Sequence, residues 1–455
     1  MYTRNRYFII QVIAFILAGI TAVSTGIDMF VSTFIDIPVQ REWNISSVVY
    51  GLSPSTTCVS NIIGGFLYSF LIDSYGRVWP YALALVHLGV VGLASAFAPS
   101  FAVFLTLGNI ASLALPAVSS VLYTTFVEFL PVRNRGKIVV SVLVVQAVGA
   151  CITGGLAWWL IPTYVERGWR YLIIATAIPK FVSAAYRLFI FPLQSPRFLI
   201  AKGRFKEARK VLEKMAWLNR KNLNDILPKD KKIVCYHNTS TGSKKTVSVC
   251  SQFYTNLLGL FKPPYLAVTI AMTIINITSM TAYYCSSVFL LQVLREFGTD
   301  PYFASFVGYL GQIPGILLMA IIVEWRGVGR INSLRFFALI TIVSWLLFAF
   351  IRDQIATPVL TIFLYFGMVP QVSLVSTYLS EIYPTAIRNT ALVFMNSTAA
   401  IVGVGAPYFS GYMTQVSIPW LYPVVWAGFY FIQFVVSLFL RRETLGQNLQ
   451  DTAVS

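Results

Sequence analysis

Two segments with the same residue pattern decide the fold of this chain: EFLPVRNR at residues 128–135 and EIYPTAIR at residues 381–388. Both have the pattern Glu-x-x-Pro-x-x-x-Arg, and they start 253 positions apart. A Gly-Arg pair recurs at the same offset, because residues 76–77 reappear as residues 329–330. Two separate patterns at one spacing predict that the chain consists of two repeated halves.

Hydrophobic runs long enough to cross a membrane fill most of the chain. It is 57% hydrophobic and 11% charged, whereas a soluble domain carries about 25% charged residues. The runs are continuous and repeatedly reach the roughly 20 residues that a helix needs to cross about 30 Å of hydrocarbon. Strands of a membrane barrel would alternate in segments of about 10 residues instead. We therefore expect twelve helical spans, at residues 8–35, 49–72, 79–97, 101–129, 138–161, 171–193, 265–291, 302–323, 331–350, 357–379, 390–413 and 419–440.

One long polar interval divides these spans into six and six. The offset of 253 residues carries the second span onto the eighth and the fourth onto the tenth, so the halves are parallel repeats related by an axis along the membrane normal. The predicted fold is an all-α membrane protein with twelve transmembrane helices in two six-helix lobes. It has four parts: an N-terminal lobe (1–193), a cytosolic linker with an amphipathic helix (194–264), a C-terminal lobe (265–440) and a cytosolic tail (441–455).

The start of the linker has the pattern of helical structure. Ser195-Pro196 suits an N-cap followed by a first helical position, and Gly203 suits a helix end. Apolar residues then recur at helical spacing among basic ones, which predicts an amphipathic helix against the cytosolic membrane surface or the bundle. These apolar residues are Phe205, Ala208, Leu212 and Met215. From about residue 219 to 251 the chain is polar and basic, and we expect a flexible linker.

Basic residues are distributed unequally between the two sides of the predicted bundle. Of the 34 Lys and Arg residues, 27 fall on the side of both termini and the linker, five fall on the other side, and Lys180 and Arg187 lie inside the sixth span. Because cytosolic loops are enriched in Lys and Arg, both termini are predicted to be cytosolic. The asymmetry explains the net charge of +17 and argues against nucleic-acid binding, since the charge lies in loops beside the membrane. Asn44, in an Asn-Ile-Ser sequence of the first outer loop, is a candidate glycosylation site.

The sequence contains no motif of an enzyme or a metal site. Its five cysteines lack metal-ligand spacing, and its two histidines, His87 and His237, stand in unrelated settings. Neither HExxH nor GxSxG occurs. We therefore expect no enzymatic activity and no cofactor, and we expect a monomer in the lipid bilayer.

Carboxylates and arginines recur where helices are expected to meet the cytosol. Such groups can pair across neighbouring helices or interact with helix dipoles, and pairs of this kind can latch one face of two lobes. Ordinary positive-inside charge would explain the arginines, but it would not explain the matched glutamates. The candidate gating network consists of Asp73, Arg77, Glu128, Arg135, Glu324, Arg330, Glu381 and Arg388.

Several segments resemble loop signatures of the major facilitator superfamily. Residues 73–77 (DSYGR) resemble the signature after its second span, and residues 443–446 (ETLG) resemble a closing motif of its sugar-porter and organic-ion group. FVEFLPVRNRGK, at residues 126–137, is most similar to the synaptic-vesicle-glycoprotein-related branch, beside the organic cation and anion transporters. Only ten residues, 292–301, separate the seventh and eighth spans, which favours the related-protein branch.

The resemblance implies a secondary active or facilitative transporter of a small organic solute, an organic ion in these branches. It implies alternating access, with a proton or sodium ion as the candidate co-transported species. It also implies residence in the plasma membrane or in a secretory or synaptic-type vesicle membrane. A second interpretation stays open: a binding or regulatory membrane protein that keeps the fold without transport, because Gln194 replaces a usual Glu and other signatures are imperfect.

Polar and aromatic residues deep in the spans are the candidate solute contacts, because transporter sites lie near mid-membrane between the lobes. Asp28, placed in the outer part of the first span, is suited to bind a cation or carry a proton, unless it only reaches outer water. Lys180, near the middle of the sixth span, needs an anionic solute or an acid as its partner. The resemblance adds Trp158, Tyr283 and Tyr284 as pocket residues, although aromatic residues are often only packing. Further mid-span polar groups, which can equally bridge helices, are Asn61, Gln312 and Gln371.

Overall fold

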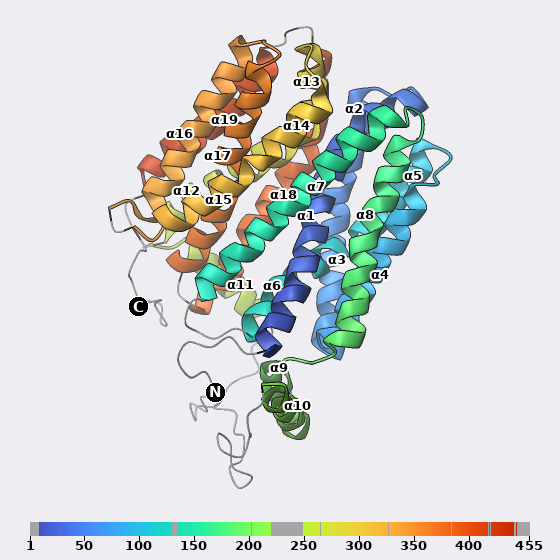
Figure 1. Cartoon of the computed structure of the whole chain (residues 1–455). Coiled ribbons are helices and arrows are strands. Elements are labelled where there is room, and N and C mark those ends of the chain that lie inside the picture. The colour runs from blue at the N-terminus through green and yellow to red at the C-terminus, as the bar shows by residue number, and fades with distance from the viewer. Residues whose placement is uncertain are drawn as a thin grey trace.

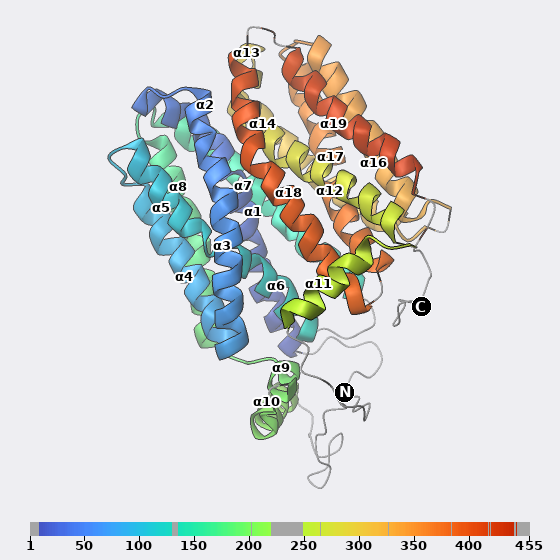
Figure 2. The same ribbon diagram turned by 180° about the vertical axis from the view of Figure 1, so that it is seen from behind.

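The computed structural model describes residues 9–129, 135–201, 203–219, 249–263, 265–325, 327–383, 385–416, 418, 420–440 and 443. Within these residues, twelve helical segments are long and apolar enough to cross a membrane, and the regular secondary structure is entirely helical. The predicted all-α fold with twelve spans is therefore confirmed. The N-terminal and C-terminal halves form two groups of helices that lie side by side (Figure 1, Figure 2).

The N-terminal lobe contains six spans. Its elements are α1 (Ile9–Trp43), α2 (Ser47–Tyr50), α3 (Leu52–Tyr75), α4 (Val78–Ser95), α5 (Phe101–Ser112), α6 (Leu115–Phe129), α7 (Arg135–Thr163), α8 (Gly168–Ala185) and a π-helical turn, η1 (Tyr186–Ile190). Two helices, α9 (Pro196–Ala201) and α10 (Phe205–Leu218), follow and lie beyond one end of the lobe (Figure 1). We call that end the inner side, following the predicted cytosolic linker, and the opposite end the outer side.

The C-terminal lobe contains the other six spans. Its elements are α12 (Leu266–Val288), α13 (Leu290–Glu296), α14 (Pro301–Leu310), α15 (Gln312–Ile322), α16 (Gly329–Phe350), α17 (Ala356–Ile382), α18 (Thr385–Gln415) and α19 (Leu421–Leu438). One more helix, α11 (Val249–Leu260), precedes them and packs against α18 on the inner side (Figure 2). The sequence did not predict this helix, which lies inside the interval assigned to the linker.

The first span is longer than predicted, and this changes the place of Asp28. The hydropathy pattern predicts an end at residue 35, but α1 continues through Pro38 to Trp43. Contacts with α8 hold the polar extension in the helix, because the Glu42 carboxylate accepts hydrogen bonds from the Trp169 indole at 2.7 Å and from Arg170 at 2.6 Å. Asp28 therefore lies near the middle of α1 rather than in its outer part.

Four spans are interrupted where continuous helices were predicted. Span 49–72 is divided into α2 and α3, span 101–129 into α5 and α6, span 265–291 into α12 and α13, and span 302–323 into α14 and α15. At Gly311, between α14 and α15, a Cβ atom would lie 2.3 Å from the Ile362 carbonyl oxygen of α17. Only glycine permits that approach of two backbones. Hydropathy gives the length of an apolar run, but it does not indicate where the helix within that run is interrupted.

The two lobes meet mainly through α7 with α14 and through α3 with α18 (Figure 1, Figure 2). On the outer side α1 adds contacts with α12 and α13. Glycines allow the close approach: a Cβ atom on Gly154 of α7 would lie 3.0 Å from the Phe306 Cα atom, and one on Gly411 of α18 would lie 2.7 Å from the Ser47 carbonyl oxygen. Small residues at helix crossings are typical of packing in membranes.

The start of the linker is helical at the predicted positions. Ser195 caps α9, with its hydroxyl oxygen 3.4 Å from the Phe198 amide nitrogen, and Gly203 ends this segment with φ of 73°. Helix α10 buries Ala208 and Met215, while residues on its other face are exposed. The predicted flexible linker lies mostly outside the described residues.

Candidate functional site

Asp28 and Lys180 form an ion pair inside the N-terminal lobe. The Lys180 ammonium lies 2.7 Å from Asp28 Oδ1, and it also donates to the Thr176 carbonyl oxygen at 3.1 Å. Lys180 is 4% exposed. Asp28 Oδ2 is buried and has no hydrogen-bond partner among the described residues. The sequence predicted either of two partners for Lys180, an anionic solute or an acid. In the structure the partner is an acid, Asp28.

A chain of hydroxyl groups lies on the same helix faces, toward the inner side of the pair. The Thr21 and Ser183 hydroxyl oxygens are 2.5 Å apart, and the Tyr81 hydroxyl of α4 donates to Thr21 at 2.8 Å. Thr21 precedes Asp28 by two helical turns, and Ser183 follows Lys180 by about one turn. The interior of the N-terminal lobe, where α1, α4 and α8 meet, is therefore polar at mid-membrane.

An aromatic cluster occupies the contact between the lobes. The ring of Phe30, on α1, lies among three tyrosine rings of the C-terminal lobe, with centroid distances of 4.4 Å to Tyr309, 6.1 Å to Tyr365 and 6.3 Å to Tyr283. These tyrosines come from three helices, α14, α17 and α12. We call Phe30, Tyr283, Tyr309 and Tyr365 the aromatic cluster. Only Tyr283 was singled out from the sequence, because nothing in the spacing of the others distinguishes them from packing residues.

The structure does not bring Asp28 and the aromatic cluster together on one surface. Asp28 and Phe30 are two residues apart on α1, so their side chains point in nearly opposite directions. Phe30 faces the C-terminal lobe, whereas Asp28 faces α8. The candidate solute contacts therefore divide into a pair within one lobe and a cluster between the two lobes.

The remaining aromatic candidates lie apart from this cluster. Tyr284 is 45% exposed, although its ring touches that of Tyr283 at 5.1 Å. Trp158 stacks on Phe306, with a centroid distance of 6.1 Å, and its indole donates to Asp300 at 3.2 Å. Trp158 thus links α7 to α14 near the outer side.

The polar candidates occupy different surroundings. Gln312 and Gln371 are buried in the C-terminal lobe, whereas Asn61 is half-buried on α3. Neither amide atom of Gln371 has a hydrogen-bond partner within the described part of the chain. A buried polar group without a partner is costly in a membrane, so this position suits a bound water or a solute.

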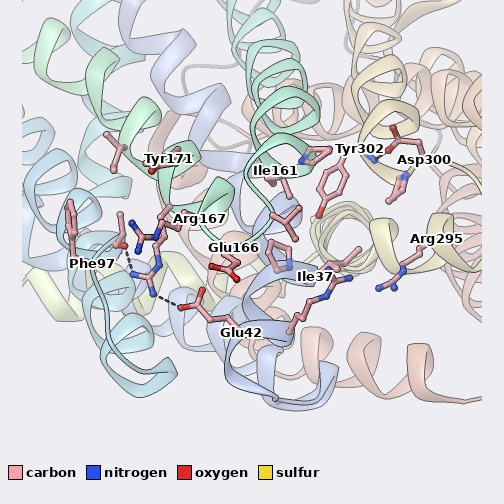
Figure 3. Close-up of a pocket in the computed structure, with 18 residues that line it drawn as sticks. Ile37, Glu42, Phe97, Ile161, Glu166, Arg167, Tyr171, Arg295, Asp300 and Tyr302 are labelled. Atoms are coloured by element: carbon pink, nitrogen blue, oxygen red, sulfur yellow. Dashed lines mark hydrogen bonds and ion pairs between the residues drawn. The ribbon is translucent and has the colours of Figure 1, made fainter.

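An open groove of about 1190 Å³ lies between the lobes on the outer side (Figure 3). Glu42, Glu166 and Arg167 line it from the N-terminal lobe, and Arg295 and Asp300 line it from the C-terminal lobe (Figure 3). Four of the five predicted outer basic residues border this groove: Arg41, Arg167, Arg170 and Arg295. Asn44, the candidate glycosylation site, is exposed in the nearby loop after α1.

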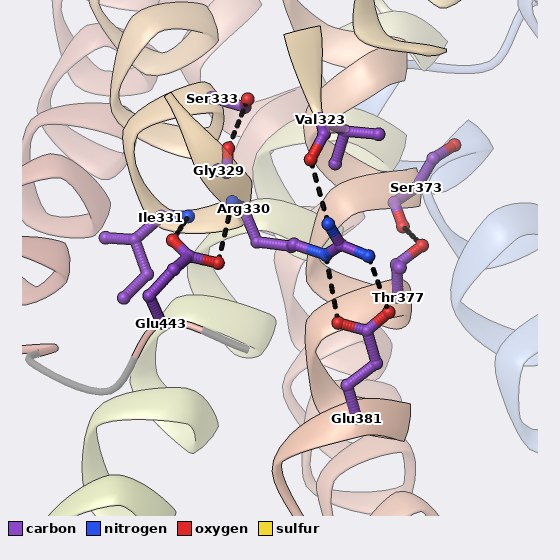
Figure 4. A network of polar contacts seen from close by, with 9 residues as sticks. All are labelled: Val323, Gly329, Arg330, Ile331, Ser333, Ser373, Thr377, Glu381 and Glu443. Carbon is purple, nitrogen blue, oxygen red and sulfur yellow. Dashed lines mark hydrogen bonds and ion pairs between the residues drawn. The ribbon is translucent and has the colours of Figure 1, made fainter. Parts of the chain in front are cut away.

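On the inner side, Arg330 connects three segments of the C-terminal lobe (Figure 4). Its guanidinium makes a bidentate pair with Glu381 at 3.0 and 3.1 Å and donates to the Val323 carbonyl oxygen at 2.9 Å. Glu443 accepts from the backbone amides of Arg330 and Ile331 at 3.0 and 3.1 Å, which satisfies the N-terminus of α16. Two members of the predicted network, Arg330 and Glu381, thus meet, and the exposed Glu324 lies outside this set of contacts.

The N-terminal lobe repeats part of this arrangement. Gly76 and Gly329 both have positive φ, at 88° and 69°, and the amide of Arg77 donates to Gln194 Oε1 at 3.1 Å. Gln194 therefore has the position in one lobe that Glu443 has in the other. This extends the repeat, although a neutral amide replaces a carboxylate. Four other members of the predicted network have side chains outside the described part of the structure: Asp73, Glu128, Arg135 and Arg388.

Comparison with known proteins finds relatives that align with most of the length of this chain. Residues 10–454 match the family described as "Sugar (and other) transporter". The chain is 27% identical over 436 residues to organic cation/carnitine transporter 7 of Arabidopsis thaliana, covering 88% of this chain and 84% of the relative. It is 24% identical to the synaptic vesicle 2-related protein of Xenopus laevis, covering 96% of this chain and 79% of the relative.

Solved structures show the same fold. The inward-open xylose transporter XylE of E. coli superposes with a TM-score of 0.72 at 15% identity, covering 96% of this chain and 97% of that one. A D-xylose–proton symporter structure gives a TM-score of 0.71 at 16% identity, covering 97% and 100%. The relatives are transporters, in agreement with the expectation that the chain is not an enzyme. This protein therefore belongs to the sugar (and other) transporter family of the major facilitator superfamily.

Proposed function

We propose that this protein moves a small organic cation across the membrane by alternating access, with the aromatic cluster as its solute site. The observation that carries the proposal is the insertion of Phe30, from one lobe, among three tyrosine rings of the other. If the lobes rock apart on the outer side, Phe30 is withdrawn and the tyrosine faces become available.

The chemistry of the cluster favours a cation. Tyrosine faces attract ammonium groups through the ring quadrupole, and the attraction grows when water is excluded. The three tyrosines are buried, so a cation bound there would be desolvated. The Arabidopsis thaliana relative is named an organic cation/carnitine transporter, which agrees with this solute class. A sugar would need many hydrogen-bonding groups, and the rings around Phe30 offer one hydroxyl each.

The Asp28–Lys180 pair is the proposed coupling element. An acid and a base that neutralise each other inside a membrane can be separated by one proton, since protonation of Asp28 removes the charge that holds Lys180. Asp28 Oδ2, which has no hydrogen-bond partner among the described residues, can carry that proton. The hydroxyl chain of Thr21, Ser183 and Tyr81 can then accommodate a displaced ammonium group. A sodium ion is the second candidate for the same role.

Uptake into proteoliposomes tests the proposal. Labelled tetraethylammonium and carnitine would be compared with an organic anion and a hexose, with and without an inward proton or sodium gradient. We expect cation uptake above that of empty liposomes and its stimulation by one gradient. Uptake of none of these solutes would favour the non-transporting interpretation, and selective hexose uptake would contradict the proposed solute class.

Substitutions in the cluster identify the solute site. Tyr309→Phe keeps the ring face and should leave the apparent affinity within about threefold, whereas Tyr309→Leu should weaken it about tenfold, the size of a partly desolvated cation–π contact. Tyr171→Leu, in the outer groove, is the matched control and should have no effect. Equal effects of the three substitutions would exclude the cluster as the site.

A further inference from the structure

Asp36 is a second buried acid of α1, and it lies in the outer contact between the lobes. It is 0% exposed and lies eight residues beyond Asp28, in the part of α1 that the hydropathy pattern excluded from the span. Asp28 pairs with Lys180, whereas no Lys or Arg among the described residues lies within ion-pair distance of Asp36. Asp36 therefore differs from Asp28 in having no cationic partner.

Asp36, Gln40, Ser47 and Gln292 form a ring of polar contacts, in which the single Ser47 proton bonds to one of the two glutamine oxygens at a time. The Asp36 carboxylate accepts from the amide of Gln292, on α13, at 2.7 Å, and from the amide of Gln40, one turn further along α1. The Ser47 hydroxyl, on α2, lies 2.9 Å from Gln292 Oε1 and 3.1 Å from Gln40 Oε1. Gln292 belongs to the C-terminal lobe and the other three residues to the N-terminal lobe. The ring thus crosses the boundary between the lobes.

The titratable groups near this ring do not neutralise a negative charge on Asp36. The charge of Asp36 acts on the hydroxyls of two tyrosines, Tyr50 on α2 and Tyr302 on α14. Tyr302 in turn lies near Arg41, Arg295 and Asp300, which border the outer groove. Among the described residues, the polar partners of the Asp36 carboxylate are the two glutamine amides, and neither carries a charge.

The physical consequence depends on the state of the lobes. A buried carboxylate with two neutral donors has lost most of its hydration, so closure of the outer contact over an ionised Asp36 is unfavourable. When the lobes separate on the outer side, Gln292 leaves with α13 and water can hydrate the charge. A proton on Asp36 removes the penalty of closure. The closed outer contact therefore binds a proton more tightly than the open one.

We infer that Asp36 is a second proton-binding site, built into the outer contact between the lobes, and that a proton taken from the outer side closes that contact. This inference rests on the alternating access proposed above, but it concerns a different residue and a different lobe boundary. By linkage, one proton shifts the ratio of closed to open forms by up to about tenfold per pH unit, with the closed form favoured as pH falls.

Distances between spin labels on the two lobes test the inference without any solute. Val165 and Ile355 are 66% and 80% exposed, in outer loops of the N-terminal and C-terminal lobes, so cysteines at these positions can carry the labels. The full chain, with its five native cysteines replaced, would be reconstituted in nanodiscs and measured from pH 5 to pH 9. We expect the short-distance population to grow as pH falls in the otherwise native protein, and to be independent of pH with Asp36→Asn.

Two control substitutions separate this site from others. Glu296→Gln neutralises an exposed acid of the same helix as Gln292 and should leave the pH response unchanged. Asp28→Asn should also retain the response, even if it stops transport, which distinguishes failure of the proposed function from failure of this inference. A pH response that persists with Asp36→Asn, or that disappears with Asp28→Asn alone, would overturn the assignment.

The medium and the labelling background need their own checks. Exchange of sodium for potassium at constant pH should not change the distances, and a change would assign the site to a metal cation instead. If the cysteine-free background does not fold, hydrogen–deuterium exchange of α13 in the native chain replaces the labels. Asp36→Asn would then be compared with the native protein at each pH. Exchange should be faster in the native protein at high pH and equal at low pH, and equal exchange at every pH would contradict the inference.

Discussion

At the residue scale, charged side chains within each lobe are stabilised by pairing with a residue of opposite charge. The N-terminal lobe places Asp28 against Lys180, and the C-terminal lobe places Glu381 against Arg330, each with a hydrogen-bonded ion pair. Removing one member of a buried pair leaves the other as an isolated charge, which is worse than removing both. The two pairs differ in depth, because Asp28 and Lys180 lie at mid-helix and the other pair lies at the inner helix ends.

Lys180→Met should destabilise the protein by about 3–5 kcal/mol if Asp28 stays ionised. The Asp28→Asn/Lys180→Met double substitution should recover most of that loss, because neither partner is then charged. Thermal unfolding of the purified protein in detergent would measure both. Equal melting temperatures for the single and double substitutions would show that the pair does not carry the stability assigned to it.

Asp28→Asn should abolish transport while leaving the amount of protein at the membrane unchanged. The amide keeps the shape of the side chain and a hydrogen-bond acceptor for Lys180, but it can neither carry a proton nor hold a charge. Initial uptake rates, normalised to the protein present, would measure the effect. Normal gradient-driven uptake by this variant would end the coupling hypothesis.

At the scale of helices, close crossings depend on glycine. A Cβ atom on Gly26 of α1 would lie 2.0 Å from the Gln146 carbonyl oxygen of α7, and one on Gly149 of α7 would lie 2.3 Å from the Val23 carbonyl oxygen of α1. The two glycines thus let α1 and α7 approach from both sides. This crossing holds the helix with Asp28 against the helix that contacts the C-terminal lobe.

Gly26→Ala should destabilise the protein by about 1–3 kcal/mol, because the added methyl group forces the two backbones apart. Gly92→Ala is the matched control, since a Cβ atom at Gly92 of α4 meets nothing within 4 Å. That change should be neutral or stabilising by about 0.5–1 kcal/mol, as glycine is unfavourable inside a helix. Melting temperatures would be compared, and equal losses for both variants would contradict the close crossing.

At the scale of the whole molecule, the orientation in the membrane sets which side the outer groove faces. The charge distribution predicts that the loop with Asn44 lies outside and the linker with Asn238 lies in the cytosol. In cells that glycosylate secretory proteins, Asn44→Gln should therefore increase electrophoretic mobility, and Asn238→Gln should not. Glycosidase treatment would confirm that the difference is a glycan. The opposite result would invert the assigned orientation.

The fold was largely predictable because its signals are local in sequence. Apolar length predicts spans, and the recurrence of Gly76-Arg77 at 329–330 predicts the two lobes. The predicted end of the first span was wrong because the apolar run stops before Asp36. In the structure, α1 continues to Trp43, because Glu42 bonds to residues of α8. The equivalence of Gln194 and Glu443 was likewise hidden, since neither residue type nor spacing matches between the lobes.

The sequence by itself determined the number of spans, their division into two lobes and the place of Lys180 near the middle of the sixth span. The spans and the place of Lys180 follow from solvation, because a charge or an apolar run has the same preference wherever the chain folds, whereas the two lobes follow from motifs that recur at one offset. Only the tertiary structure decided that Asp28 pairs with Lys180, that Phe30 lies among the tyrosines, and that Asp36 and Gln292 meet across the lobe boundary. Those contacts join residues up to 335 positions apart. They depend on how each helix is rotated about its axis. Local sequence patterns do not specify this rotation when a span is apolar on most of its faces.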